Sequence, residues 1–462
     1  MDSLHPDLLR YIGSFGEIPH PGVCQKWNNA TSLQVIKNDF GIEAYEFSAN
    51  PSLKVFTSLV GERTRKLILN NPSQEIVDRL YMCPNLESLR IKNADEVKSI
   101  SAVEGLSNLR ELSLYWCQLI SEIPRLTPKL KKLCLDLVPQ IKEISFLSSN
   151  LEELKLHSLG EVTEIPWLPE TLRSLVLGFL SDDFTVLNFP RQLQTLELYG
   201  FPFVTEIPPL PPTLSTLLLF NFPLIIEIPP LPSTLERLEL NDLENVTEIP
   251  TLPENLLYLT VTQPGNVTEI PTLPETLIQL ELEYMPWVTQ IPSLPSTLRR
   301  LSLVDMPRLS EIPLFPALKA LYLRSLVQVT KIPRFPQTLE VCTIDHFPLL
   351  TEIPPLSSNL QELSLSDLFL LAKIPLFQQN LKKLYLRNLK KVIEMPPFPQ
   401  EIYGLTLIDL PEVREISPLP SHLLDLRIGG LISLASIPPI PKRVQTVVLY
   451  DLPLIPENDN FH

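Results

Sequence analysis

The sequence predicts a curved solenoid, in which one short unit is repeated and each copy adds one strand to a single parallel sheet. Two observations lead to this fold class. Ile207-Pro208 returns as Ile228-Pro229, and the leucine pattern of 214–219 returns at 235–240. The aliphatic residue before this proline recurs through fifteen intervals, of which twelve are 21 residues, two are 20 and one is 22. A fixed short period is typical of solenoids, which grow by stacking units rather than by adding separate cores.

Each unit reads LxxLxLxxφxxVTEIPxLPxT, where φ is Leu, Phe or Met. The LxL portion alternates apolar and variable residues, which predicts a short strand with one buried face. No unit can bury its apolar face alone, so neighbouring strands must stack, about 4.8 Å apart, into one long parallel sheet. An LxxLxL core with a period between 20 and 29 residues is the leucine-rich repeat.

Prolines predict the other half of each unit. Proline follows the aliphatic marker in thirteen of sixteen units, and in most units a second proline comes three residues later. Proline fixes φ, lacks a backbone donor and holds the preceding residue in extended geometry. We therefore expect a mostly non-helical, polyproline-like convex face, with the parallel sheet lining the concave face of a curved horseshoe.

Composition narrows the class of function. The 462 residues carry a formal net charge of −15, which disfavours nucleic acid as a partner because such surfaces need a basic stripe. The start of the chain has no secretory pattern, and no stretch approaches about 20 apolar residues. Five scattered cysteines indicate reduced thiols. We expect a cytoplasmic monomer without cofactor, metal or membrane contact.

Residues 1–45 are predicted to form a small helical module outside the repeat. Leu4, Leu8, Leu9 and Ile12 have helical spacing, and Val23-Cys24 with Trp27 follow a turn rich in Gly and Pro. This region resembles the F-box, although His5 separates Leu4 from Pro6 and the segment before Val23 is about four residues shorter than usual. The resemblance implies docking on a Skp-type adaptor of cullin ubiquitin ligases through Leu4, Pro6, Leu8, Leu9, Ile12, Val23, Cys24 and Trp27. The alternative is a cap over the first edge of the sheet.

Along the rest of the chain, the pattern divides into three parts. Residues 46–129 hold transitional and irregular units. A helical segment is expected over 33–62, spanning the boundary with the N-terminal module, and strands are expected from about Thr64. Residues 130–450 hold the regular units, and 451–462 form a C-terminal cap or tail. Nineteen strands are expected between Leu67 and Leu449, and the weakest unit, at 181–189, is a candidate kink or insertion.

The repeat resembles the LPX-type leucine-rich effectors of bacterial pathogens and the Leu/Pro-rich repeats of plant immune receptors. The bacterial family places Asn at the φ position, whereas this chain has Asp or Asn one residue earlier, as at Asn221, Asp242 and Asp305. The asparagine ladder of that family is thus absent or shifted. The resemblance implies an effector acting in the cytosol of a host cell.

Strand alternation places the third, fifth and seventh positions of each unit on the concave face, the usual recognition surface of solenoids. Leu218 and Phe220 are unusual there because polar residues dominate these columns. An apolar centre with a charged surround is typical of a protein-binding hot spot, although single apolar residues also occur on any surface. The predicted partner-binding residues are Val176, Glu197, Tyr199, Leu218, Phe220, Glu239, Tyr258, Glu281, Glu283, Tyr322, Arg324, Tyr385 and Arg387.

No pattern in the sequence predicts catalysis. Six histidines lack metal-ligand spacing, and no Gly-rich phosphate loop is present. Cys134-Leu135-Asp136 matches the Cys-x-Asp nucleophile of some effector ligases, but it lies in a predicted strand with no such domain after it. Two hypotheses remain: a substrate-recognition subunit of a cullin ubiquitin ligase, and a non-enzymatic scaffold or sequestering protein whose N-terminus is only a cap.

Overall fold

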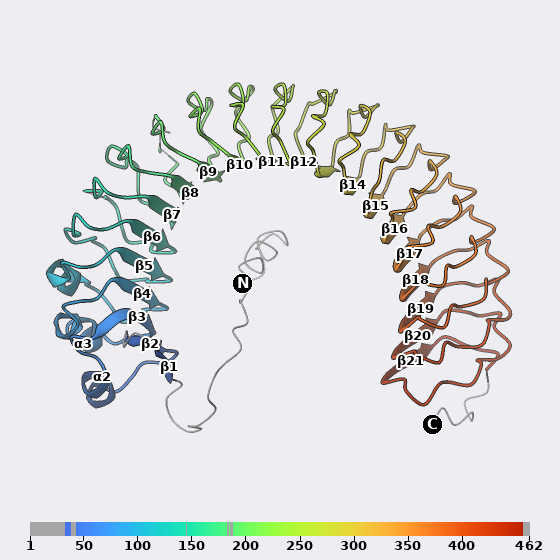
Figure 1. Ribbon diagram of the computed structural model, residues 1–462, viewed down its shortest axis with the longest axis horizontal. Coiled ribbons are helices and arrows are strands. Elements are labelled where there is room, and N and C mark those ends of the chain that lie inside the picture. The colour runs from blue at the N-terminus through green and yellow to red at the C-terminus, as the bar shows by residue number, and fades with distance from the viewer. Residues whose placement is uncertain (1–32, 38–42, 145, 183, 185–187, 456–462) are drawn as a thin grey trace.

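The protein is a horseshoe whose inner wall is one continuous sheet (Figure 1). The computed structural model describes residues 33–37, 43–144, 146–182, 184 and 188–455. The F-box-like positions and the tail after residue 455 lie outside these residues. The predicted fold class, a leucine-rich-repeat solenoid with the sheet on its concave face, is confirmed. Its 21 strands are parallel throughout, except for the antiparallel pair β1–β2.

The strands and helices follow one another in chain order. Their bounds are β1 Leu33–Lys37, β2 Glu43–Phe47, α2 Leu53–Leu59, β3 Thr64–Asn70, α3 Gln74–Val77, the short 3₁₀ helix η1 Leu80–Met82, β4 Ser88–Lys92, η2 Ser101–Gly105, β5 Glu111–Tyr115, β6 Lys132–Asp136, β7 Glu153–Leu159, β8 Ser174–Leu180, β9 Thr195–Tyr199, β10 Thr216–Phe220, β11 Arg237–Asn241, β12 Tyr258–Thr262, β13 Gln279–Glu283, β14 Arg300–Val304, β15 Ala320–Arg324, β16 Val341–Asp345, β17 Glu362–Ser366, β18 Lys383–Arg387, β19 Gly404–Ile408, β20 Asp425–Gly429 and β21 Thr446–Tyr450. The nineteen strands expected from the sequence are β3 to β21.

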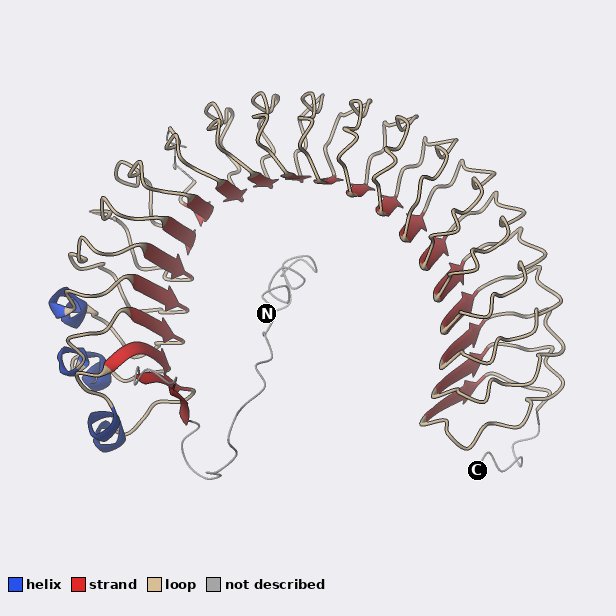
Figure 2. Ribbon diagram, in the orientation of Figure 1, coloured by secondary structure: helices blue, strands red, loops and turns tan. Residues whose placement is uncertain are grey.

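The convex side follows the proline content. Within the described residues, helices cover it only in the first units, where residues such as 53–59 contain no proline (Figure 2). From β5 onwards, the described part of the chain crosses the convex side in turns and extended segments. This confirms the expected non-helical Pro-rich face.

One local expectation is wrong. Residues 33–47 were expected to lie in helix, but β1 and β2 form an antiparallel pair there, and β2 continues into the parallel sheet beside β3. Helix begins only at Leu53, after Ser52, whose hydroxyl accepts a hydrogen bond from the Val55 amide. A short apolar pattern fits either structure, and the free edge of the sheet favours a strand.

The core is a stack of leucine columns. Leu217 of β10 pairs with Leu196 of β9 and Leu238 of β11, and all three are fully buried. The same register recurs from strand to strand, so each unit covers the apolar face of the one before it. The isoleucine of the IP phrase closes the column on the convex side, where Ile228 is 7% exposed.

Threonine from the LPxT phrase joins consecutive units. The Thr234 hydroxyl donates to the carbonyl of Leu214 at 2.8 Å, and Thr213 donates to Leu193 at 2.7 Å. Equivalent bonds are made by Thr171, Thr276, Thr297 and Thr338. These hydroxyls satisfy backbone carbonyls that the loop geometry leaves without an amide partner.

The shifted Asp and Asn residues have a different role. The residue directly after nearly every strand has a left-handed backbone, with φ of 59° at Asn221, 54° at Asp242 and 51° at Asp305. Asn, Asp and Gly adopt this conformation at the lowest cost among the residues. The Asn221 amide still donates to the carbonyl of Asn241, so the chain turns outwards without breaking the ladder.

We expect Asn221→Val to lower the stability of the protein by about 1–2 kcal/mol, because a β-branched residue is strained at this positive φ. Asn221→Gly should have a much smaller effect, since glycine adopts this backbone freely. The midpoint of urea unfolding, followed by circular dichroism, measures both changes. Equal losses of stability in the Val and Gly variants would contradict the explanation that strain at the positive φ causes the loss.

Candidate functional site on the concave face

The concave face is built by strand alternation. In β10 the leucines Leu217 and Leu219 point into the core, whereas Thr216, Leu218 and Phe220 face the open side. The in-register ladder lines up the equivalent residues of neighbouring strands. All the concave residues predicted from the sequence lie in these three columns, on β8–β13, β15 and β18. Their role as a binding site remains a prediction.

An apolar and aromatic cluster lies at β9 and β10. Tyr199 is only 6% exposed, and its ring centroid lies 6.2 Å from that of Phe220 and 6.1 Å from that of His157. Leu218 and Phe220 are half-buried, so they offer apolar surface to a partner. Val176 stands two strands away from Leu218, with Glu197 between them in the same column.

Gly178 makes room for this cluster. A Cβ atom at Gly178 would lie 2.7 Å from Cδ2 of His157 and 2.9 Å from Cβ of Tyr199. The missing side chain therefore lets the two flanking rings lean towards each other across β8. A neighbouring glycine, Gly200, has φ of +66° and gives space to the ring of Phe179.

The carboxylates around the cluster are engaged by neighbours. Glu197 accepts a hydrogen bond from Tyr199 Oη at 2.8 Å, and Glu239 forms an ion pair with Arg237. Glu281 accepts from Arg300 Nε at 3.0 Å. Glu283 lies within 3.5 Å of the Ser302 hydroxyl. The sequence pattern predicted an acidic surround, whereas in the structure Arg237 and Arg300 neutralise two of these four carboxylates.

The later predicted residues belong to a separate part of the arc. Arg300 also lies over the ring of Tyr322, 4.5 Å from its centroid, and Arg237 lies 5.8 Å from the centroid of Tyr258. Arg324 pairs with Asp345 at 3.2 Å. Tyr385 and Arg387 lie on β18, eight strands beyond Leu218, so they do not join the central cluster.

A polar network on β5–β7 was not singled out from the sequence. Cys134 Sγ lies 3.3 Å from Tyr115 Oη, and Asp136 lies 2.7 Å from Lys155 Nζ and 3.1 Å from His157 Nδ1. Burial opposes ionisation of Asp136, but hydrogen bonds from His157 and Lys155 outweigh it and lower the pKa of this carboxyl. Alternate residues of adjacent strands share a face, which is the signal that could have revealed the network.

Cys134 is a poor nucleophile in this setting. Its side chain is buried, and burial raises the pKa of its thiol, which the hydrogen bond with Tyr115 and the charge of Lys155 only partly offset. Burial likewise raises the pKa of Cys83 and of Cys117 to about 11 and that of Cys342 to about 12. The four described cysteines are all free thiols. The Cys-x-Asp match therefore corresponds to a structural strand.

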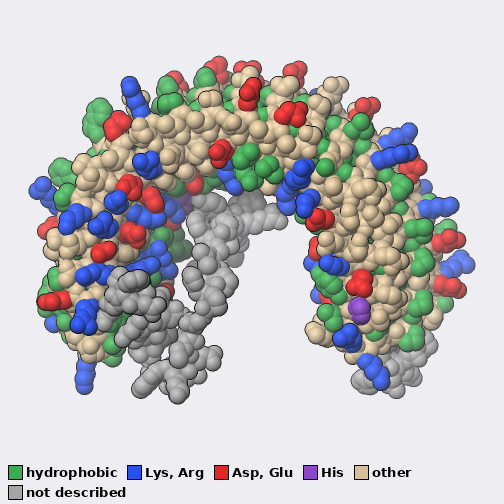
Figure 3. Space-filling view, viewed as in Figure 1, with side chains coloured by type: hydrophobic (Ala, Val, Ile, Leu, Met, Phe, Trp, Pro, Cys, Tyr) green, Lys and Arg blue, Asp and Glu red, His purple; other side chains and the backbone are tan. Residues whose placement is uncertain are grey.

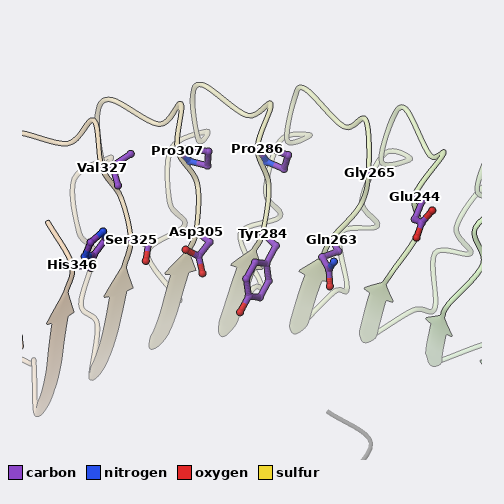
Figure 4. Close-up of a pocket in the computed structure, with 10 residues that line it drawn as sticks. All are labelled: Glu244, Gln263, Gly265, Tyr284, Pro286, Asp305, Pro307, Ser325, Val327 and His346. Atoms are coloured by element: carbon purple, nitrogen blue, oxygen red, sulfur yellow. The ribbon is translucent and has the colours of Figure 1, made fainter. Parts of the chain in front are cut away.

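A groove of about 600 Å³ runs along the ends of β12–β16. It is lined by the left-handed positions Gln263, Tyr284, Asp305, Ser325 and His346, and by Glu244, Gly265, Pro286, Pro307 and Val327 from the following turns (Figure 4). None of the predicted concave residues lines it. Gly265 is required there, since a Cβ would lie 1.9 Å from the carbonyl oxygen of Glu244.

Within the described ranges, no group of three or more His, Cys, Asp or Glu side chains is arranged to hold a metal ion. Among the helices in the same ranges, none has the length and apolar character needed to cross a membrane.

Comparison with known proteins supports the fold. No protein-family model matches the chain, and no curated protein matches its sequence. Among solved structures, the chain is similar to YopM from Yersinia enterocolitica WA-314, with 22% identity and a TM-score of 0.53 over 87% of this chain and 89% of that chain. CroV588, described as a circular LRR protein, shares 19% identity with a TM-score of 0.48, over 84% of this chain and 70% of that chain. The likeness to YopM shows the leucine-rich-repeat fold.

The buried thiols should react slowly with a thiol reagent such as DTNB at pH 8. A thiol with a pKa of about 11 is ionised roughly a hundredfold less at this pH than an ordinary cysteine, and only the thiolate reacts. Rising pH should speed the reaction as the thiols ionise. The measurement uses a Cys24→Ser variant, because Cys24 lies outside the described residues.

A urea-unfolded sample is the control and should react fully within the mixing time. Labelling of Cys134 in the native protein as fast as in urea would contradict its assignment as a structural residue.

Proposed function

We propose that this protein recognises another protein through its concave face, with Leu218 and Phe220 as the anchor of the contact. The observation that supports this most is the half-buried apolar pair beside Tyr199, where two apolar side chains stand together on one strand in columns that hold mostly polar residues. Apolar and aromatic anchors surrounded by satisfied polar groups are characteristic of binding hot spots.

The shape of the molecule favours a folded partner over a small molecule. The concave wall is open and curved (Figure 1), whereas small-molecule sites usually enclose most of the ligand surface. The ion pairs Arg237–Glu239, within β11, and Arg300–Glu281, between β14 and β13, hold side chains in place beside the anchor. Such order before binding reduces the entropy lost on association.

The finer proposal concerns the N-terminus. We propose that Leu4, Pro6, Leu8, Leu9, Ile12, Val23, Cys24 and Trp27 form an F-box that docks on a Skp-type adaptor and cullin, in the cytosol of a host cell. These residues lie outside the described part of the chain, so the proposal rests on the sequence resemblance alone. The protein would then act by positioning: it raises the effective concentration of a target lysine near the charged conjugating enzyme and supplies no reacting group.

The alternative is a scaffold or sequestering protein that holds the same target without ubiquitylation. Deletion of residues 1–32, which leaves β1 and β2 in place, separates the two: a scaffold keeps its target and its cellular effect, whereas a ligase subunit keeps its target but loses the effect.

Replacing Leu218→Asp together with Phe220→Asp should weaken partner binding by about thirtyfold or more, because the loss of even one hot spot costs about 2 kcal/mol. The partner is first identified by affinity capture from eukaryotic lysate with mass spectrometry, and its affinity for both proteins is then measured. Both side chains face the open side of β10, so the fold should survive, as circular dichroism would show.

The matched control is Thr260→Asp with Thr262→Asp, which adds the same charges at equivalent positions of β12. The control should bind more tightly than the β10 variant. Unchanged affinity of the β10 variant would remove this cluster as the anchor.

For the N-terminal module, wild-type protein should co-purify with a Skp-type adaptor and a cullin, and Leu8→Ala with Trp27→Ala should lose both while keeping the target. Quantitative mass spectrometry of the captured proteins measures this. Absence of adaptor and cullin from the wild-type capture would refute the ligase role and leave the scaffold.

A further inference from the structure

Cations on the concave face are, as a rule, neutralised by a carboxylate from the same or the next strand. The in-register ladder makes this possible, because residues 20 or 21 positions apart lie side by side. The pairs within the described residues are Lys132–Glu153, Lys155–Asp136, Arg237–Glu239, Arg300–Glu281, Arg324–Asp345, Lys383–Glu362 and Arg427–Asp425.

Two exceptions occur among the described residues: Arg387 stands alone on β18, and three cations lie together on β3 and β4. Lys66, Arg90 and Lys92 face the open side of these two strands, and none of them has an ion-pair partner among the described residues. Their neighbours in the ladder are Ser88, Ile68 and Asn70, which carry no charge. We call these three cations the β3–β4 basic patch. Figure 3 shows Lys and Arg side chains over the arm that carries the first units.

Two carboxylates flank the patch without forming an ion pair with it among the described residues. Glu46 on β2 lies opposite Ile68, and Glu111 on β5 accepts a hydrogen bond from Ser88 at 2.8 Å. Asp136, farther along, is held by Lys155 and His157. The guanidinium of Arg90 lies 5.9 Å from the ring centroid of Tyr115, whose hydroxyl is in turn in contact with Cys134. This stacking orients Arg90 without removing its charge.

We propose that the β3–β4 basic patch binds a cluster of carboxylates on the protein partner held by the concave face. The geometry suits a pair or triplet of acidic side chains. Neighbouring strands are about 4.8 Å apart and alternate residues of one strand about 6.6 Å apart, which matches acids spaced i, i+2 in an extended segment or i, i+4 on a helix.

A protein segment fits this patch better than a nucleic acid. Phosphodiester binding needs a basic track that follows several phosphates, whereas these cations occupy two adjacent strands with carboxylates on β2 and β5 nearby. The formal charge of −15 over the whole chain also opposes a long polyanion. A short acidic segment can contact the three cations while it stays between the carboxylates of β2 and β5.

One partner can contact both the patch and the apolar anchor, so this inference rests on the proposed function for its biological meaning. Six strand spacings separate β4 from β10, or about 29 Å along the sheet. A domain of about 100 residues has a comparable diameter. The partner is therefore expected to present an apolar anchor and an acidic segment on one face.

The test uses the full-length protein and a fluorescein-labelled peptide of ten glutamates as the probe. Fluorescence anisotropy should show binding that weakens from 50 to 200 mM salt. The variant Lys66→Glu, Arg90→Glu, Lys92→Glu should bind the probe about tenfold more weakly or worse, because like charges then face each other. Circular dichroism confirms that the variant is folded.

The matched control is Lys319→Glu, Lys383→Glu, Arg427→Glu, which changes the net charge equally but alters cations already paired with carboxylates. Arg324 is left unchanged in this control, because it is a predicted partner-binding residue. The control should retain binding close to wild type. No binding by wild type, or an equal loss in both variants, would overturn the proposal. Tighter binding of a ten-nucleotide single-stranded DNA than of the peptide would assign the patch to nucleic acid instead.

Failure of this inference is distinguishable from failure of the proposed function. The probe has no apolar anchor, so Leu218→Asp with Phe220→Asp should bind it as wild type does. If that double variant also keeps the captured partner, the anchor is wrong while the patch stands.

Discussion

The in-register stacking of leucines from strand to strand is the interaction on which the rest of the structure depends. Leu196, Leu217 and Leu238 occupy one buried column, and each is covered only by its neighbours in the adjacent units. No unit could bury these side chains alone, and a shift of one residue would turn them outwards. The threonine bonds, the left-handed turns and the charge pairs all follow from this single register.

The same register determines what the concave face can do. Because every unit presents three outward positions at fixed spacing, recognition must come from the residues that vary among identical backbones. Most of the charged side chains that vary in this way form an ion pair with a nearby side chain of opposite charge, as in Arg300–Glu281 and Arg324–Asp345. The side chains that indicate a binding site are those that such pairing does not explain. These are the apolar pair on β10 and the unpaired cations on β3 and β4.

The fold was predictable because the period is a long-range signal carried by many copies. The three outward columns followed from strand alternation, and the predicted concave residues lie in them. Cross-strand partners were not predictable, since pairing Glu281 with Arg300 requires the register and the side-chain geometry. Residues 33–47 were misassigned because a short apolar pattern does not separate helix from strand, and the open sheet edge is a tertiary influence.

The acidity of the chain lies mainly outside this face. The glutamates of the VTEIP phrase, among them Glu206, Glu227 and Glu248, are exposed on the outer turns, whereas cations and carboxylates nearly balance on the concave strands. An acidic partner is therefore repelled by the outer surface and meets net positive charge mainly at one arm of the inner wall. Electrostatic complementarity governs the orientation and rate of encounter more than the final affinity. This asymmetry of charge would therefore orient such a partner with its acidic segment towards β3 and β4. The apolar pair on β10 then supplies the affinity that the charges do not.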